Sequence, residues 1–205
     1  MKSSFIKSAF TAASLVLLGA GMTAHAGPFD ELSVVDESIS FSAYESVYVA
    51  PVKMDLTFDR KFRVSGPTRQ LPRGASRPMT DAEIDRNAQE LHERLERRLS
   101  KNFAIADAPG DGVLTVEATV TRLISTRPTN KEIQLEVGLD LQNSVSAGGA
   151  DIDVLLSENG EARAELSESF KGRFRDGLPR IHTWQDAEFA YNRLARKLTK
   201  YIAKN

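Results

Sequence analysis

Four side chains in the C-terminal half of the sequence are of types that can do chemistry. Asp151 and Asp153 flank Ile152, so a β-strand here would place both carboxylates on one face, as in a metal site or an acid–base pair. His182 is of a residue type common in acid–base catalysis, and Trp184 could stack on a sugar. A solvated strand face and a core anchor explain the same residues more simply. We therefore keep the four as candidates only for a hydrolase or transferase with a carboxylate-based site.

The sequence lacks the short signatures of well-known catalytic centres. It contains no Gly-x-Ser-x-Gly, no His-Glu-x-x-His and no glycine-rich loop that leads into a helix. It also contains no cysteine, which excludes disulfides, zinc–thiolate sites and a thiol nucleophile. We predict no catalytic residue, no metal site and no cofactor, and we expect a protein that is not an enzyme.

A basic segment is the candidate site for a partner. Residues 60–79 contain no acid, and their prolines and glycines predict a loop. A solvated surface that neutralises acidic segments elsewhere is one interpretation, and a site for an anionic envelope component or an envelope protein is the other. The residues that would make this contact are Arg60, Lys61, Arg63, Arg69, Arg73 and Arg77.

The N-terminus is typical of a cleavable secretory signal peptide. Two lysines precede an apolar run that ends in the small-x-small pattern Ala24-His25-Ala26. The run is short for a membrane-spanning helix, and no second apolar run of that length follows it. We expect residues 1–26 to be removed. Residues 27–205 would then be one soluble domain in a bacterial periplasm, without a lipid anchor because no cysteine is present.

The net charge limits the kinds of partner. The signal peptide contains two of the 27 basic residues and none of the 28 acidic ones, so the mature chain has a net charge of about −3. Nucleic-acid binding rests on clustered positive charge over a whole surface. We therefore do not expect a nucleic-acid partner.

Alternation of apolar and polar residues predicts a mainly antiparallel sheet. The clearest signal is a hairpin in which Ile152 and Leu166 face inward on strands joined by Asn159-Gly160, a pair suited to a tight turn. Pro51 lacks a backbone donor and limits strand pairing at its position. Further strands are predicted at 46–53, 103–107, 114–121 and 133–141.

A long amphipathic helix is predicted to follow the basic loop. Thr80 and Glu83 form a capping box at its start. On its solvent side, Glu90 is spaced to pair with Arg94, and Glu93 with Arg97. Its core stripe is predicted to be Ile84, Ala88, Leu91, Leu95 and Leu99.

A second helix is predicted at the C-terminus. We expect Thr183 to be its N-cap, with Asp186 three residues on. The predicted fold is an α+β domain in which a mainly antiparallel sheet of about five strands is covered by two helices. The residues expected on the solvent side of the second helix are Arg193, Arg196, Lys197, Lys200 and Lys204.

Gly148 and Gly149 precede the hairpin and raise the question of a ligand loop. A phosphate-binding loop needs further glycines, a helix after it and usually a lysine, whereas a strand follows here. Without a Cβ, the two glycines permit a bulge, a strand crossing or a close approach of helix to sheet. We expect their role to be structural.

Four segments together resemble an uncharacterised family of bacterial cell-envelope proteins, many of which look like lipoproteins. They are SVYVAPVKM at 46–54, DAPGDGVLTVEATVTRL at 107–123, GGADIDVLL at 148–156 and TWQDAEFAYNRLARKL at 183–198. The resemblance implies a single α/β domain with helices on one face of a mainly antiparallel sheet, and it transfers no catalytic residue. This chain departs from the lipoprotein members because it has no cysteine.

Two classes of function follow from the sequence. The first is a non-enzymatic binding or assembly module of the envelope, which the export signal, the segregated charge and the lack of a catalytic motif favour. The second is a periplasmic hydrolase or transferase that uses the four residues named first.

Overall fold

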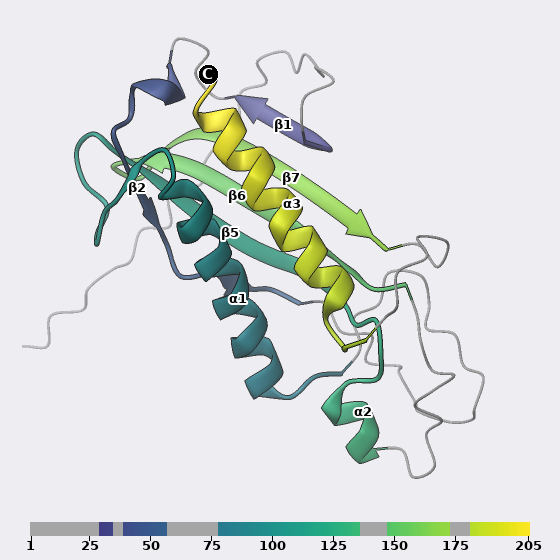
Figure 1. Ribbon diagram of the computed structural model, residues 1–205. Helices are drawn as coiled ribbons and strands as arrows, with labels where there is room; N and C mark the ends of the chain where they lie inside the picture. The colour runs from purple at the N-terminus through teal and green to yellow at the C-terminus, as the bar shows by residue number, and fades with distance from the viewer. Residues whose placement is uncertain (1–28, 35–38, 57–77, 136–146, 173–180) are drawn as a thin grey trace, which may run out of the picture.

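Seven strands and two long helices organise the described part of the chain. The computed structural model describes residues 29–34, 39–56, 78–135, 147–172 and 181–205 (Figure 1). In chain order the elements are β1 (Glu31–Val34), a 3-10 helix (Phe41–Ala43), β2 (Ser46–Val49), β3 (Lys53–Met54), α1 (Asp81–Leu99), β4 (Ala104–Ile105), β5 (Val113–Ile124), α2 (Asn130–Leu135), β6 (Gly149–Glu158), β7 (Glu161–Lys171) and α3 (Gln185–Ile202).

The strands form one mixed sheet in the order β1-β7-β6-β5-β2-β4, with β3 also paired to β5. The pairs among β1, β7, β6 and β5 are antiparallel, whereas β2 pairs in parallel with both β5 and β4, and β3 pairs in parallel with β5. The predicted sheet of about five mainly antiparallel strands under two helices is therefore wrong. The described residues contain seven strands in a mixed sheet and three helices, in a single domain.

The parallel pairs have a topological cause. The chain leaves β2, passes through α1 and returns beside β2 as β5, and a crossover through a helix brings the two strands into parallel pairing. The strand at β2 ends before Pro51, as predicted, and β3 then resumes pairing along the same side of β5. β3 and β4 have two residues each; β4 lies within the strand predicted at 103–107, and β3 begins at the last residue of the strand predicted at 46–53.

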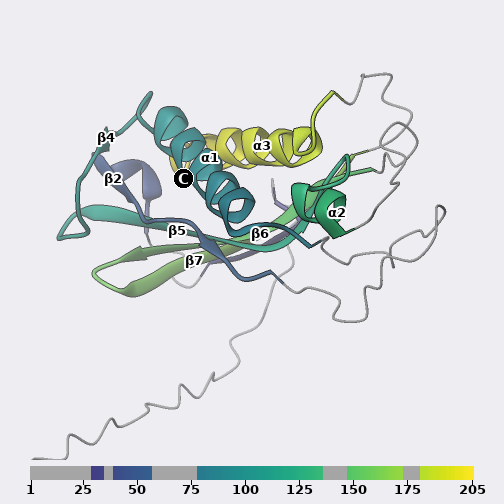
Figure 2. The same ribbon diagram turned by 90° about the horizontal axis from the view of Figure 1, so that it is seen from below.

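Both long helices lie on one face of the sheet, and their apolar stripes form the core with the strand residues beneath them (Figure 2). In the described residues the opposite face carries no helix. The fully buried large side chains of this core include Leu91, Leu95, Leu99, Leu114, Ile152, Leu156, Tyr191, Leu194 and Leu198.

The start of α1 confirms the predicted capping box but not the whole predicted stripe. The Thr80 hydroxyl accepts a hydrogen bond from the Glu83 amide, and the Glu83 carboxylate accepts one from the Thr80 amide at 2.9 Å. Glu83 and Asn87 are buried, whereas Ile84 and Ala88 are half-buried. The polar residues are buried because partners satisfy them there.

One of those partners lies in α1 itself, and the others lie in α2 and α3. Glu83 Oε1 accepts a hydrogen bond from the Asn130 amide at 3.0 Å. The Asn87 side chain donates to the carbonyl of Glu83 at 2.8 Å, and its Oδ1 accepts from the Tyr191 hydroxyl of α3 at 3.2 Å. Burial raises the pKa of Tyr191 well above its usual value, so its hydroxyl remains a proton donor. This bond ties α1 to α3 inside the core.

The strand predicted at 133–141 is wrong in its first residues. Residues 130–135 form α2, and residues 136–141 lie outside the described residues. A second capping box starts this helix: the Thr129 hydroxyl accepts from the Glu132 amide at 3.1 Å, and Glu132 accepts from the Thr129 amide at 2.8 Å. The pattern Thr-x-x-Glu was visible in the sequence, but the alternating residues after it favoured a strand.

The predicted hairpin is confirmed as β6 and β7. Asn159 and Gly160 have φ angles of 50° and 80°, as a two-residue hairpin turn requires. At the end of β6, Glu158 accepts a hydrogen bond from the Tyr44 hydroxyl at 2.8 Å and pairs with Arg163. These contacts lower the pKa of Glu158, the Tyr44 hydrogen bond most of all.

Gly148 and Gly149 permit close packing at the start of β6. A Cβ at position 149 would overlap the carbonyl oxygen of Phe170, and a Cβ at position 148 would lie 2.7 Å from the hydroxyl oxygen of Thr126. The Gly148 amide instead donates to the buried carboxylate of Asp186, in the first turn of α3, at 2.8 Å. The two glycines therefore let the start of β6 pack closely against β7 and against the chain that follows β5.

Gly149→Ala is expected to lower the free energy of unfolding by about 2 kcal/mol or more, because a main-chain oxygen occupies the space that the new Cβ needs. Gly110→Ala is the matched control, since its Cβ would lie in ordinary contact 4.0 Å from Val113, and its effect should stay within about 0.5 kcal/mol. Urea denaturation followed by circular dichroism measures both. Equal stability of the two variants would contradict the close packing at Gly149.

Candidate functional site

The outer surfaces of α1 and α3 carry two stripes of polar and charged residues. Residues at positions i, i+3, i+4 and i+7 of a helix lie on one face. The α1 stripe, which continues past the end of the helix, is Arg94, Arg97, Arg98 and Lys101, and the α3 stripe is Phe189, Asn192, Arg193 and Arg196. Six of these eight residues are cations.

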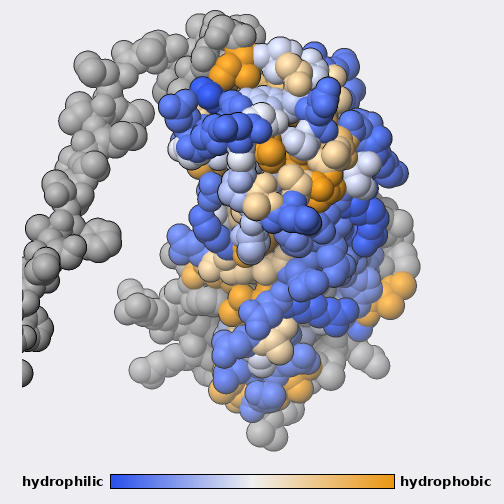
Figure 3. All heavy atoms as spheres, turned by 90° about the vertical axis from the view of Figure 1, so that its left-hand side faces the viewer, coloured by the Kyte–Doolittle hydropathy of each residue, from blue (hydrophilic) through white to orange (hydrophobic). Residues whose placement is uncertain are grey.

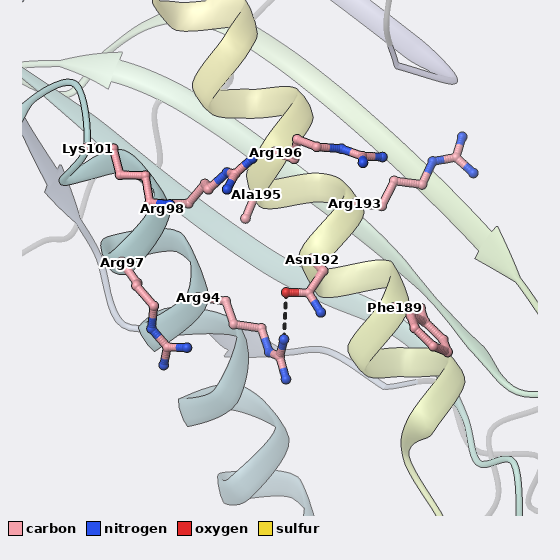
Figure 4. Close-up of a pocket in the computed structure, with 9 residues that line it drawn as sticks. All are labelled: Arg94, Arg97, Arg98, Lys101, Phe189, Asn192, Arg193, Ala195 and Arg196. Atoms are coloured by element: carbon pink, nitrogen blue, oxygen red, sulfur yellow. Dashed lines mark hydrogen bonds between the residues drawn. The ribbon is translucent and has the colours of Figure 1, made fainter. Parts of the chain in front are cut away.

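The two stripes border one groove on the helix layer. The groove has a volume of about 410 Å³, and the eight residues line it together with Ala195 (Figure 4). A guanidinium nitrogen of Arg94 donates to Oδ1 of Asn192 at 2.6 Å and joins the helices at the surface. Figure 4 shows Arg94 and Asn192 pointing toward each other between α1 and α3. Viewed from the α1 side, the described surface is mostly polar (Figure 3).

The groove cations differ in whether protein carboxylates neutralise them. Arg94 pairs with Glu90, as the sequence predicted, and lies 3.7 Å from Glu188. Arg193 pairs with Glu168 at 2.6 Å. Within the described ranges, the cations that have no acidic partner are Arg97, Arg98, Lys101 and Arg196. The predicted pair of Glu93 with Arg97 does not form in this part of the chain, where Glu93 accepts from Gln89 instead.

The cations of α3 differ in whether they contact a carboxylate of the sheet. Glu168 of β7 is buried, and Arg193 and Lys197 both contact its carboxylate, the latter at 2.7 Å. Of the residues expected on the solvent side, Arg193 and Lys197 are therefore only partly exposed, because both contact the Glu168 carboxylate, and Arg193 also lines the groove. Arg196 and Lys200 remain exposed.

Packing alone does not account for the unpaired cations. Arg94 and Arg98 are four residues apart on one helix face, and Arg98 and Lys101 are three apart, so their repulsion costs a few tenths of a kcal/mol. The dipole of α1 offsets this cost for the residues near its C-terminus. It does not act on Arg196, which lies within α3 and faces the same groove. An anion in the groove would remove the repulsion.

The four side chains considered for catalysis do not meet. Asp151 pairs with Arg122 and accepts from Ser169 at 2.7 Å, and Asp153 accepts from Ser167 at 2.6 Å. Both carboxylates lie on the sheet face away from the helices, since the Ile152 between them points into the core.

The other two candidates lie on the helix side. His182 Nδ1 is 3.4 Å from Glu188 of α3, and the partly buried Trp184 packs on the core. The structure thus assembles no site from these four residues. In the described part of the chain, no three histidine or acidic side chains converge as metal ligands.

The predicted N-cap of α3 is wrong. Trp184 occupies the N-cap position, and the Thr183 carbonyl accepts from the Thr126 amide at 2.7 Å. Asp186 does not close a capping box, because its carboxylate turns inward to Gly148. Threonine and aspartate are residue types that suit the start of a helix, but the Asp186 side chain forms a tertiary contact with Gly148 and does not cap the helix.

The basic loop predicted as a partner site lies almost entirely outside the described residues, as do all six of its cations. Sequence reasoning overlooked the groove, although the spacing of Arg94, Arg97, Arg98 and Lys101 was visible. Of these residues, the sequence patterns indicated a role only for Arg94 and Arg97, as ion-pair partners on the solvent side of the helix. Nothing local in the sequence indicates that the stripes of α1 and α3 lie side by side. None of the helices in the described ranges has the length and hydrophobicity needed to cross a membrane.

Comparisons with known proteins give a family and weak structural likenesses. A family model described as "Protein of unknown function (DUF3313)" matches residues 12–198. No curated protein matches the chain significantly.

Among solved structures, a dodecamer of a single-substitution variant of PelC from Paraburkholderia phytofirmans has 12% identity and a TM-score of 0.42, covering 85% of this chain and 100% of that one. A second PelC dodecamer from this organism has 11% identity and a TM-score of 0.38, covering 85% and 94%. Protein XCC0632 from Xanthomonas campestris, of family DUF330, has 14% identity and a TM-score of 0.42, covering 78% and 87%. With TM-scores this low, nothing about partners or assembly follows from these likenesses.

Neutralising the unpaired groove cations is expected to leave the fold intact. The triple variant Arg97→Gln, Arg98→Gln and Arg196→Gln should change the free energy of unfolding by no more than about 0.5 kcal/mol, because no described carboxylate loses a partner. Lys197→Gln should cost about 1–2 kcal/mol, because the buried Glu168 keeps only Arg193. Chemical denaturation measures both variants. A large loss in the triple variant would mean that these cations stabilise the fold.

Proposed function

We propose that this chain, which belongs to the family of proteins of unknown function DUF3313, is an exported, non-enzymatic binding module. Its partner is anionic and binds in the groove between α1 and α3. The proposed compartment is the bacterial periplasm, and the proposed partner is an anionic component or a protein of the cell envelope. The leader-like first 26 residues and the absence of cysteine support this location.

One observation carries the proposal: four cations without an acidic partner in the described residues line one groove from two facing helices. Guanidinium groups offer several donors in a fixed fork, so they bind carboxylate or phosphate by charge-assisted hydrogen bonds. Several such groups along one groove also raise the local concentration of anions, although the whole chain is slightly acidic.

The basic loop is a second proposed contact with the same partner. It precedes the N-terminus of α1, whereas Arg97, Arg98 and Lys101 lie at the C-terminal end of that helix. At about 1.5 Å of rise per residue, Arg97 lies about 25 Å along the helix axis from the end of the loop. The two contacts can therefore be tested separately.

Binding to a panel of anions tests the groove. The wild type, the groove triple variant (Arg97→Gln, Arg98→Gln and Arg196→Gln) and a control triple variant are titrated with four anions. These are inorganic phosphate, polyphosphate, oligogalacturonate and phosphatidylglycerol vesicles, with phosphatidylcholine vesicles as the neutral reference. We expect at least one anion to bind. The groove triple variant should weaken that binding about tenfold or more, because each lost charge-assisted hydrogen bond is worth about 1.5 kcal/mol or more. Added salt should weaken it further by screening.

The control carries the same change in charge outside the groove, as Arg86→Gln, Lys131→Gln and Lys171→Gln, all exposed residues. It should bind like wild type. Absence of binding to every anion, or equal losses in the two triple variants, would contradict a function based on the groove.

Deleting residues 60–77 tests the loop. We expect weaker retention of the variant on isolated envelope components, since six cations are lost. Retention is measured by co-sedimentation, with circular dichroism as the check of folding. Unchanged retention would remove the loop from the proposed binding surface.

A further inference from the structure

We infer that the anionic ligand of the groove is a linear acidic glycan, that is, a sugar polymer with repeated carboxylate groups. This inference rests on the proposed function, because it names the chemical class of the partner at the same groove. Three features of the groove point to this class: an aromatic side chain, a side-chain amide and the arrangement of the cations.

The aromatic feature is Phe189, the first residue of the α3 stripe. Its side chain is 41% exposed, although it is large and apolar, and it lines the groove together with Arg193 and Arg196. The face of an aromatic ring carries partial negative charge and attracts the polarised C–H groups on the apolar face of a sugar ring. A polyphosphate offers no such face, so Phe189 would contribute nothing to its binding.

The amide feature is Asn192, one turn beyond Phe189. Its Oδ1 accepts from Arg94 at 2.6 Å, which fixes the side chain between the helices. In the described residues its NH2 group donates to no protein acceptor. An amide donor that lines the same groove as an aromatic ring can bind a sugar hydroxyl, which accepts hydrogen bonds.

The cations are spread along a line and do not converge on a point. Arg94, Arg98 and Lys101 span seven residues, or about 10 Å along the helix direction, with Arg196 on the opposite side of the groove. Arg97, Lys101 and Arg196 are exposed, so no closed cavity surrounds a single anion. This arrangement fits an extended ligand whose carboxylates recur along its length. Each planar guanidinium can bind a carboxylate with two parallel hydrogen bonds.

A length series tests the extended form of the ligand. Isothermal titration calorimetry measures the full chain against galacturonic acid, against oligogalacturonates of increasing length and against their methyl esters, which are neutral. We expect affinity to rise over the first few sugar units, to level off once the oligomer spans the groove, and to be lost in the methyl esters. Equal affinity for the monomer and the long oligomers would overturn the linear ligand. Equal affinity for the methyl esters would overturn the acidic one.

A second comparison tests the sugar against other polyanions. Phe189→Ala should weaken binding of long oligogalacturonate about tenfold, or about 1.4 kcal/mol, and leave polyphosphate binding unchanged. The combination of Arg97→Gln and Arg98→Gln should weaken both ligands. Ile181→Ala is the matched control, since Ile181 is 70% exposed and does not line the groove.

The outcomes separate the two proposals. If Phe189→Ala has no effect on oligogalacturonate, or if polyphosphate binds and oligogalacturonate does not, the glycan is wrong while the anion-binding groove stands. If no anion binds the wild type, the proposed function itself fails. Circular dichroism of each variant shows that loss of binding is not loss of fold, and the exposed position of Phe189 makes an intact fold the expected result.

Discussion

The carboxylate of Asp186 is buried where α3 begins, and the position of that helix depends on it. It accepts from the Gly148 amide at 2.8 Å, and the Asp186 amide donates to the Thr126 hydroxyl at 3.2 Å. The Gly172 amide donates to the Gly148 carbonyl at 2.9 Å, so the ends of two strands and the start of α3 meet at one point. A Cβ at Gly172 would overlap the Asp186 carboxylate. Glycine is required at position 172 because the buried carboxylate group of Asp186 occupies the space that a Cβ would need.

From this junction α3 runs across the sheet beside α1, and hydrogen bonds between polar side chains hold the two helices in position. The Tyr191–Asn87 hydrogen bond lies inside the core, and the Arg94–Asn192 bond lies at the surface. Glu168 then draws Arg193 and Lys197 toward β7. With its inward cations neutralised by the sheet, α3 leaves Arg196 facing the cations of α1. The charged groove is thus a consequence of how the helices are anchored.

The separation of charge between the layers gives the molecule two different faces. The open sheet face carries ion pairs and hydrogen bonds that satisfy each other, such as Arg122 with Asp151 and Lys53 with Glu117. The helix face carries cations without a described acidic partner. In the described residues, no three histidine or acidic side chains converge as metal ligands on either face. The groove between α1 and α3 is the exposed, charged surface on which the proposed binding function rests.

The sequence by itself determined the features whose causes lie within a few residues of each other. These are the hairpin turn at Asn159 and Gly160, the capping box that starts α1, the end of β2 before Pro51 and the i,i+4 pair of Glu90 with Arg94. Membership of an uncharacterised family also followed from segments of the sequence.

Only the tertiary structure decided the parallel pairs of β2 and the inward turn of Asp186. It also decided that Arg193 and Lys197 meet Glu168 and that Arg193 and Arg196 line the groove. Their partners are distant in the chain: Asp186 is 38 residues from Gly148, and Arg94 is 98 residues from Asn192. A periodic pattern tells which face of a helix is polar, but it carries no information about what lies opposite that face. The groove exists because two separate stripes meet across that distance.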